Sequence, residues 1–224
     1  MSLPRKTITQ YTNILKHIGQ SILVSSLLSL LFSGQVQAAD TARAALDHFL
    51  TNLHTLQARF EQRVYQVGEA LTEPSTGTFQ LKRPKQFRWD YHTPEVKKVI
   101  ADGRDLWLVE NDLEQITQHY QSMALKHTPA AILLGTELLE TNFTSVERGT
   151  YQGLQWLELR PKDTDSDIKQ VTLAFQNHTL HRLELVDQLD QVTEFRFYDM
   201  QRNPTLANER FVFNPPDDWD LFQH

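Results

Sequence analysis

Arg83 is the residue whose type and position most suggest chemistry in this chain, because it is a cation beside an aromatic stretch. It stands in Lys82-Arg83-Pro84-Lys85-Gln86-Phe87-Arg88-Trp89-Asp90-Tyr91, where aromatic and polar residues alternate. Proline cannot donate to a sheet ladder, so we expect two strands to meet at a corner at Pro84, with Arg83 at the rim of an aromatic sheet face. Such a face must be covered, either by other residues of the protein core or by something that binds reversibly. Arg83 is then either a functional cation or a solvated edge charge that discourages pairing between sheets, and composition alone favours the edge charge.

The other reactive residue types do not form a recognisable site. Asp163-Thr164-Asp165-Ser166-Asp167 is like the start of a calcium loop, but Ile168 and Ala174 stand where that loop needs glycine and glutamate. His178 and His181 lack the three or four converging ligands of a zinc site. The sequence has no nucleophile elbow, phosphate-binding glycine loop or dinucleotide fingerprint. We therefore expect no metal, no cofactor, no catalytic residue and no enzyme activity.

A signal peptide is predicted at the N-terminus. Arg5, Lys6 and Lys16 precede or flank an apolar run over residues 18–32, and Val36-Gln37-Ala38 suits cleavage. At about fifteen residues the run is short for a membrane-spanning helix, although an uncleaved anchor is the alternative. We expect cleavage after about Ala38, which leaves residues 39–224 as one mature domain outside the cytoplasm.

Composition narrows the function further. The chain has no cysteine, so it cannot be a disulfide scaffold, hold a thiolate metal site or be lipidated at an N-terminal cysteine. Loss of the three basic residues of the signal changes the formal charge from −6 to −9. An acidic body without a long basic run argues against nucleic-acid binding and against stable docking on anionic lipid.

Alternating apolar and polar residues predict strands over most of the mature chain. Before the alternation begins, apolar residues at helical spacing predict a helix over 40–56, with Asp40 or Thr41 as N-cap. Turn signals such as Asp102-Gly103 separate the strands. The expected strands are Gln57–Val67, Thr76–Arg83, Gln86–Tyr91, Val96–Ala101, Asp105–Glu110, Gln115–His119, Phe143–Arg148, Leu154–Arg160, Lys169–Gln176, Leu180–Val186, Val192–Tyr198 and Glu209–Phe213. Short strands with short turns and no linker predict one twisted antiparallel sheet.

A second, very apolar helix is predicted among the strands. Thr128 suits its N-cap, Pro129 its first position and Gly135 its end. A single sheet face has few means of being covered, so the two apolar helices are its natural covers. The aromatic residues on alternating strand positions form either closed core or a ligand pocket; they are Phe60, Phe79, Phe87, Trp89, Phe175, Phe195, Phe197, Phe211 and Phe213.

Several segments, taken together and in this order, resemble a known family. They are Leu56-Gln57-Ala58-Arg59-Phe60-Glu61-Gln62, Gly77-Thr78-Phe79-Gln80-Leu81-Lys82-Arg83-Pro84, Phe87-Arg88-Trp89, Asp102-Gly103-Arg104-Asp105-Leu106-Trp107, Thr128-Pro129 and Phe211-Val212-Phe213-Asn214-Pro215-Pro216. From Ala42 to Leu221 the chain is similar to the outer-membrane lipoprotein carrier proteins, the LolA family. The resemblance implies an α+β, mainly β fold: a single curved antiparallel sheet forming an open half-barrel, with short helices as a lid over a hydrophobic cavity.

The resemblance also implies roles for individual residues. Arg83 would hydrogen-bond to lid residues and hold the empty cavity shut, and Phe87 matches a position important for transfer. The implied lipid-binding cavity comprises Phe60, Phe79, Leu81, Phe87, Trp89, Leu106, Leu108, Phe175, Phe195 and Phe197. The implied lid comprises Leu46, Phe49, Leu50, Leu53, Ile132, Leu133 and Leu134.

The implied function is that of a soluble, monomeric periplasmic carrier. It would take lipoproteins by their acyl chains from an inner-membrane lipoprotein-releasing ABC transporter and deliver them to an outer-membrane receptor lipoprotein. One alternative is a periplasmic lipoprotein or lipid sensor of the same fold; such sensors carry a further C-terminal domain, whereas this chain ends eleven residues after its last expected strand. Another is a non-catalytic structural domain whose aromatic face is closed core.

Overall fold

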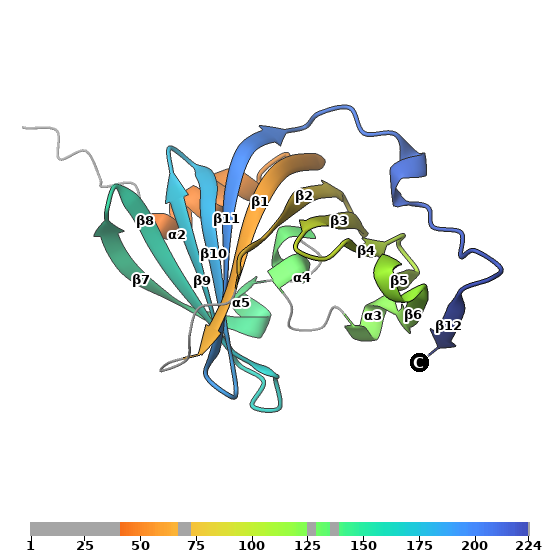
Figure 1. Cartoon of the computed structure of the whole chain (residues 1–224). Helices are drawn as coiled ribbons and strands as arrows, with labels where there is room; N and C mark the ends of the chain where they lie inside the picture. The colour runs from red at the N-terminus through yellow and green to blue at the C-terminus, as the bar shows by residue number, and fades with distance from the viewer. Residues whose placement is uncertain (1–40, 67–72, 125–128, 135–138, 224) are drawn as a thin grey trace, which may run out of the picture. The chain divides into compact units, whose positions relative to one another are not determined.

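Twelve strands form one open sheet in the order β12-β6-β5-β4-β3-β2-β1-β11-β10-β9-β8-β7 (Figure 1). The computed structural model describes residues 41–66, 73–124, 129–134 and 139–223; the predicted signal peptide, Asp40, Thr128 and Gly135 lie outside these ranges. The strands are β1 (Thr55–Gln66), β2 (Ser75–Lys82), β3 (Gln86–Thr93), β4 (Lys97–Ala101), β5 (Asp105–Glu110), β6 (Gln115–Tyr120), β7 (Phe143–Tyr151), β8 (Leu154–Pro161), β9 (Ile168–Gln176), β10 (Thr179–Asp187), β11 (Gln191–Arg202) and β12 (Asp220–Gln223).

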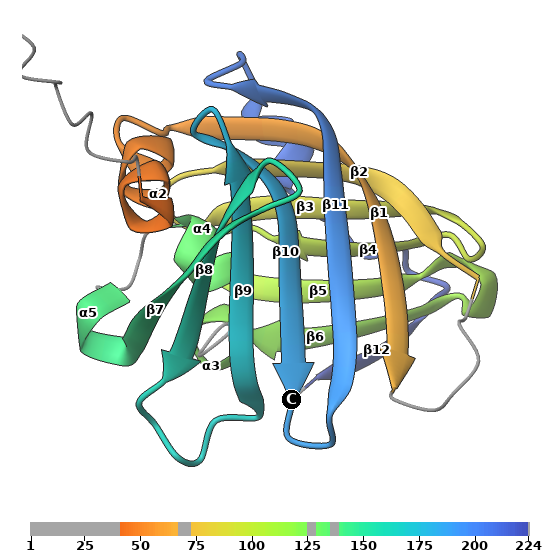
Figure 2. The same ribbon diagram turned by 90° about the vertical axis from the view of Figure 1, so that its left-hand side faces the viewer.

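The sheet is curved and strongly twisted, with its helices on the concave side. In Figure 2, strands β7 to β10 cross in front of β2 to β6, and the long strands β1 and β11 lie between the two halves. Helix α2 (Ala42–Leu50) contacts β7 to β10, and α4 (Pro129–Leu134) lies between the two halves (Figure 1). The short helices α3 (Gln121–Ala124) and α5 (Leu139–Asn142) flank α4 in the chain. This arrangement confirms the expected open half-barrel. Within the described ranges, no helix has the length and apolar character needed to cross a membrane.

The first helix is shorter than its apolar pattern predicts. It begins after Thr41, whose Oγ1 accepts a hydrogen bond from the Ala44 N–H at 3.1 Å, so one of the two predicted N-caps is confirmed. The expected end at residue 56 is wrong: the helix stops at Leu50, because Asn52 takes a left-handed conformation with φ of 53° and the chain then enters β1. Leu53 remains buried although it lies outside the helix.

The strand pattern is otherwise confirmed up to β11. The eleven expected strands before residue 209 all occur, with ends shifted by a few residues. The corner at Pro84 is a tight turn between β2 and β3, which pair from Lys82 with Gln86 to Thr76 with Thr93. Arg83 therefore does lie at one end of the sheet.

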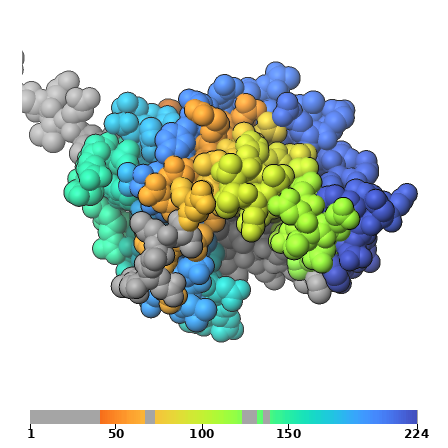
Figure 3. All heavy atoms as spheres, viewed as in Figure 1, coloured from red at the N-terminus to blue at the C-terminus, as the bar shows by residue number. Residues whose placement is uncertain are grey.

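The last expected strand, Glu209–Phe213, is wrong. After β11 the chain leaves the sheet and forms a 3₁₀ turn, η3 (Asn208–Phe211), which contacts β3. The chain then returns as β12, which pairs in parallel with β6 and was not predicted. Figures 1 and 3 show this C-terminal segment running along the side of β4 to β6. Phe213 and Trp219 pack there on a small outer cluster of Ile100, Trp107, Val109 and Ile116, so Phe213 does not belong to the aromatic concave face.

Candidate functional site

The guanidinium of Arg83 joins the two helices that cover the concave face. Its Nη1 donates to the carbonyl oxygen of Leu50, in the last turn of α2, at 3.0 Å. Its Nη2 and Nε donate to the carbonyl oxygen of Leu133, in α4, at 3.0 and 3.3 Å. Helix carbonyls near a C-terminus lack intrahelical partners and carry partial negative charge, so a cation suits both positions. One side chain from the β2–β3 turn thus holds α2 and α4 together.

Arg83 is half-buried, and its surroundings explain its electrostatics. Burial, and secondarily the charge of Arg202, lower the pKa of the Arg83 guanidinium. Because a guanidinium titrates far above neutral pH, Arg83 remains charged and its hydrogen bonds are charge-assisted.

The predicted cavity residues gather in one cluster on the concave face, which we call the concave cluster. Its centre is a set of aromatic rings: Trp89 lies 4.4 Å from Phe79, 4.9 Å from Phe195 and 5.3 Å from Phe60 between ring centroids. Phe197 stacks on the same group. Leu81, Phe87, Leu106 and Phe175 belong to the cluster as well. Leu108 shares the face with Leu106 by alternation along β5 but is 36% exposed and lies outside the cluster.

The predicted lid residues pack on the same cluster. Phe49 of α2 lies 6.0 Å from Phe175 between ring centroids. From α4, all three predicted residues are buried. The members contributed by the two helices and the turn after α2 are Leu46, Phe49, Leu53, Ile132, Leu133 and Leu134, with Leu50 packed partly buried against them. The structure therefore brings the predicted cation, aromatic face and covering helices into one place.

Two further residues at the end of β11 hold α2 in position and were not predicted. The Nη2 of Arg202 donates to the carbonyl oxygens of Phe49 at 3.1 Å and Thr51 at 2.9 Å, and its guanidinium lies 5.8 Å from the centre of the Phe49 ring. The side-chain oxygen of Asn203 accepts from the His54 N–H at 2.8 Å. No local sequence signal marks this contact, since the partners are about 150 residues apart.

The opposite end of α2 is fixed by a carboxylate. The Glu147 side chain, on β7, accepts from the backbone N–H of Ala42 at 3.1 Å and of Arg43 at 2.8 Å. A negative charge at a helix N-terminus pairs with free N–H groups and with the helix dipole. Helix α2 is thus bound to the sheet at both ends, whereas Arg83 links α4 to α2 and to the turn before β3.

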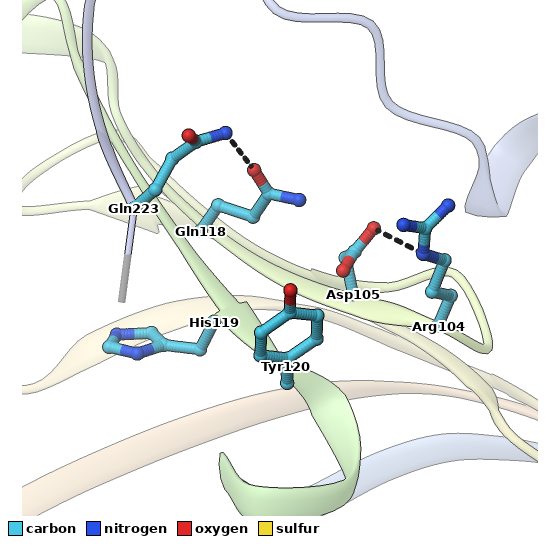
Figure 4. Close-up of a pocket in the computed structure, with 6 residues that line it drawn as sticks. All are labelled: Arg104, Asp105, Gln118, His119, Tyr120 and Gln223. Atoms are coloured by element: carbon cyan, nitrogen blue, oxygen red, sulfur yellow. Dashed lines mark hydrogen bonds and ion pairs between the residues drawn. The ribbon is translucent and has the colours of Figure 1, made fainter.

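A separate hollow of about 300 Å³ lies at the ends of β5, β6 and β12 (Figure 4). It is lined by Arg104, Asp105, Gln118, His119, Tyr120 and Gln223. The Gln223 amide donates to the side-chain oxygen of Gln118 at 2.8 Å, and the exposed Arg104 lies 3.7 Å from the Asp105 carboxylate. Within the described part of the chain, no three His, Cys, Asp or Glu side chains converge to hold a metal.

Comparisons with known proteins agree on one family. A sequence profile described as "Outer membrane lipoprotein carrier protein LolA" matches residues 51–214. The "Outer-membrane lipoprotein carrier protein" of Dechloromonas aromatica (strain RCB) is 35% identical over 200 residues, which are 89% of this chain and 95% of that protein. The protein of the same name from Methylococcus capsulatus (strain Bath) is 36% identical over 188 residues, 84% of this chain and 90% of that protein.

The fold also has a counterpart among solved structures. An uncharacterised conserved protein from Thermus thermophilus superimposes with a TM-score of 0.54 at 12% identity, over 82% of this chain and 99% of that one. At this identity the likeness concerns the fold alone.

Proposed function

Because the chain belongs to the LolA family of outer membrane lipoprotein carrier proteins, we propose that it is a periplasmic carrier that binds lipoproteins by their acyl chains. In this proposal the signal peptide of residues 1–38 directs export and is cleaved. The carrier receives its cargo from an inner-membrane lipoprotein-releasing ABC transporter and delivers it to an outer-membrane receptor lipoprotein.

One observation carries the proposal: a single cation, Arg83, bridges two apolar helices over an aromatic face. An ordinary core needs no such bridge, because apolar packing alone covers a sheet face. Hydrogen bonds from Arg83 at the edge of the two apolar helices are suited to a lid that must open. The reason is that a few hydrogen bonds can be broken and formed again without unfolding of the sheet. We assign Arg83 the role of latch and α4 with α2 the role of lid.

Acyl-chain energetics explain why a carrier with a latch is needed. Each CH₂ group exposed to water is unfavourable by about 0.8 kcal/mol, so a sixteen-carbon chain favours burial by roughly 10 kcal/mol. Unassisted transit through water is then negligible, but a permanently open cleft would release the chain too slowly. A closed empty state lowers the net affinity by the free energy that stabilises closure. The latch thereby permits both loading and release, and the energy need not come from ATP bound to this protein.

Binding of acyl ligands by the purified mature chain tests the proposal. We expect an environment-sensitive hydrophobic dye to bind the folded protein and to be displaced by palmitic acid. Chain purified from periplasm should carry acylated proteins identifiable by mass. A protein that binds neither dye nor palmitic acid, and that purifies without acylated proteins, would not be a carrier.

The aromatic face supplies a matched pair of variants for the same assay. Phe195→Ala removes a ring from the concave cluster, and Phe213→Ala removes one from the outer cluster. We expect only Phe195→Ala to weaken palmitic acid displacement, because only its ring packs against the concave cluster. Equal loss in both variants would indicate a general effect on folding.

A further inference from the structure

In the middle of the concave cluster, the buried indole N–H of Trp89 has no hydrogen-bond partner among the residues that the structure describes. Trp89 is 9% exposed, and its Nε1 has no acceptor within the described part of the chain. The surrounding rings of Phe60, Phe79 and Phe195 offer none. Buried indole N–H groups are normally paired, and leaving one unpaired is unfavourable.

A buried acceptor that has no partner among the described residues lies on the same face of the sheet. Gln62, on β1, stands opposite Phe195 of β11 and on the same face as Phe60. Its side-chain oxygen Oε1 is buried and also without a partner among the described residues. The ring of Phe195, which neighbours Gln62 in the ladder, contacts Trp89. Among the described residues, one unsatisfied donor and one unsatisfied acceptor therefore neighbour Phe195 on the concave face.

Two other tryptophans have acceptors for their indole N–H groups. The Trp107 Nε1 donates to the Asp102 carboxylate at 3.0 Å in the outer cluster. The Trp156 Nε1 donates to the carbonyl oxygen of Tyr151 at 3.2 Å. Native structures pair most of their buried polar atoms, so an unpaired donor and acceptor on one apolar face require an explanation.

We propose that Trp89 and Gln62 form a subsite for the carboxyl-derived group at the head of a bound acyl chain. The Trp89 N–H donates to the carbonyl oxygen of an ester or amide, and Gln62 Oε1 accepts from an amide N–H. This inference rests on the proposed function, since it concerns a ligand of the same cavity. It names the ligand class more closely: acyl chains joined through an amide satisfy both groups, esters satisfy one, and plain hydrocarbon satisfies neither.

A specificity of this kind follows from the cost of unpaired groups. A site built to hydrogen-bond a ligand rejects an analogue that lacks the group, because its own polar atoms then stay buried and unpaired. The charged carboxylate of a free fatty acid such as palmitic acid is unfavourable in the apolar face without a counter-ion, so it stays in solvent and the acid binds through its chain alone. A neutral amide or ester carries no charge and can occupy the subsite.

The test compares three ligands of equal chain length: N-methyldodecanamide, methyl dodecanoate and tetradecane. We expect affinity for the full-length mature protein to fall in that order, by about fivefold for each hydrogen bond lost. Trp89→Phe keeps an aromatic ring but removes the N–H. It should bring the amide and ester closer to the alkane by about fivefold, while Gln62→Leu should abolish the preference for amide over ester. Trp107→Phe is the matched control, because its N–H already has a partner, and it should leave all three ratios unchanged.

A spectroscopic measurement checks the contact itself. The ¹⁵N–¹H resonance of the Trp89 indole should shift downfield with the amide and the ester but not with tetradecane. The affinity experiment compares the ratios of affinity between ligands within each variant. Any loss of packing in Trp89→Phe affects all three ligands alike and therefore leaves these ratios unchanged. Similar affinity ratios in wild type and Trp89→Phe, or the same indole shift with all three ligands, would overturn the inference while leaving an acyl carrier intact. If none of the three binds, the proposed function itself fails.

Discussion

Substitution of Arg83 by leucine should turn a carrier that releases its ligand into one that retains it. Arg83 links the sheet to α4 through two N–H groups that share the carbonyl oxygen of Leu133 at 3.0 and 3.3 Å. Leucine removes these donors and the bond to Leu50 but keeps apolar contact with the covering helices. The closed empty state loses stability, whereas the open, ligand-bound state loses little.

The size of the effect follows from these contacts. A hydrogen bond to a charged group contributes about 1.5–3 kcal/mol, and the half-buried position and shared acceptor of Arg83 place its link to α4 near ~2 kcal/mol. When the closed state dominates, apparent affinity equals intrinsic affinity multiplied by the open fraction. Removal of ~2 kcal/mol from closure therefore strengthens acyl binding about thirtyfold. We expect most of this gain as slower dissociation.

Equilibrium and stopped-flow binding of a fluorescent palmitoyl probe measure this prediction. Transfer of the bound probe to acceptor vesicles should slow by a similar factor. Arg83→Lys keeps the charge but loses the planar fork of donors, and should fall between wild type and Arg83→Leu. Arg104→Leu is a control for loss of charge alone, since the Arg104 side chain lies in the β4–β5 turn at the same end of the sheet, is 83% exposed and pairs with Asp105.

The refuting result is an affinity for the palmitoyl probe that stays within twofold of wild type, or weakens, in a variant that folds normally. Either outcome would mean that the hydrogen bonds of Arg83 do not limit opening. Arg83 would then be a structural link of the β2–β3 turn.

Four further predictions address the core, the backbone and the electrostatics. Phe87→Glu places an unpaired charge in the concave cluster, where Phe87 is 3% exposed. Loading of palmitic acid should fall, and the free energy of unfolding should drop by about 3 kcal/mol or more. The control variant Phe87→Leu should still load palmitic acid. Gly77→Ala should lower the free energy of unfolding by about 3 kcal/mol in urea titration, because the added Cβ would lie 2.0 Å from the carbonyl oxygen of Asp90. A wild-type free energy of unfolding in this variant would show that the backbone can shift. Arg202→Gln should lower the free energy of unfolding by about 2 kcal/mol through release of the α2 carbonyls, and an unchanged melting temperature would contradict the anchoring of α2. Burial, and then the charge of Glu194, raise the pKa of Glu184 in the folded protein. Ionisation of Glu184 therefore opposes folding above this folded-state pKa, and the effect vanishes below the pKa of the unfolded state. Glu184→Gln should stabilise the protein in urea titrations near pH 7 but not near pH 4, and an equal effect at both pH values would argue against burial as the cause.

Sequence patterns predicted the elements that depend on local spacing. The period of two located eleven strands, because each strand alternates between the concave face and the other face of the sheet. Pro84 correctly marked a turn, which placed Arg83 at the end of the sheet. The apolar run before residue 135 correctly predicted a short helix at Pro129–Leu134.

Two local interpretations failed because burial alone does not define an element. The apolar spacing after Leu50 continued the helical period, yet Leu53 and Leu56 are buried from a turn and a strand instead. Phe211 and Phe213 alternate like strand residues but lie in a 3₁₀ turn and the segment beyond it. The same apolar residue can face a core from any of these conformations.

By itself, then, the sequence determined the strands up to β11, the aromatic face, the apolar α4 helix and the family to which the chain belongs. The tertiary structure alone decided which carbonyls meet Arg83 and that Arg202 and Glu147 fix the two ends of α2. It also decided that Trp89 Nε1 and Gln62 Oε1 have no partner among the described residues on one face. The physical reason is that periodicity records which face of an element is buried. Hydrogen bonds between residues about 30 to 150 positions apart depend instead on strand register and on the path of the chain between them.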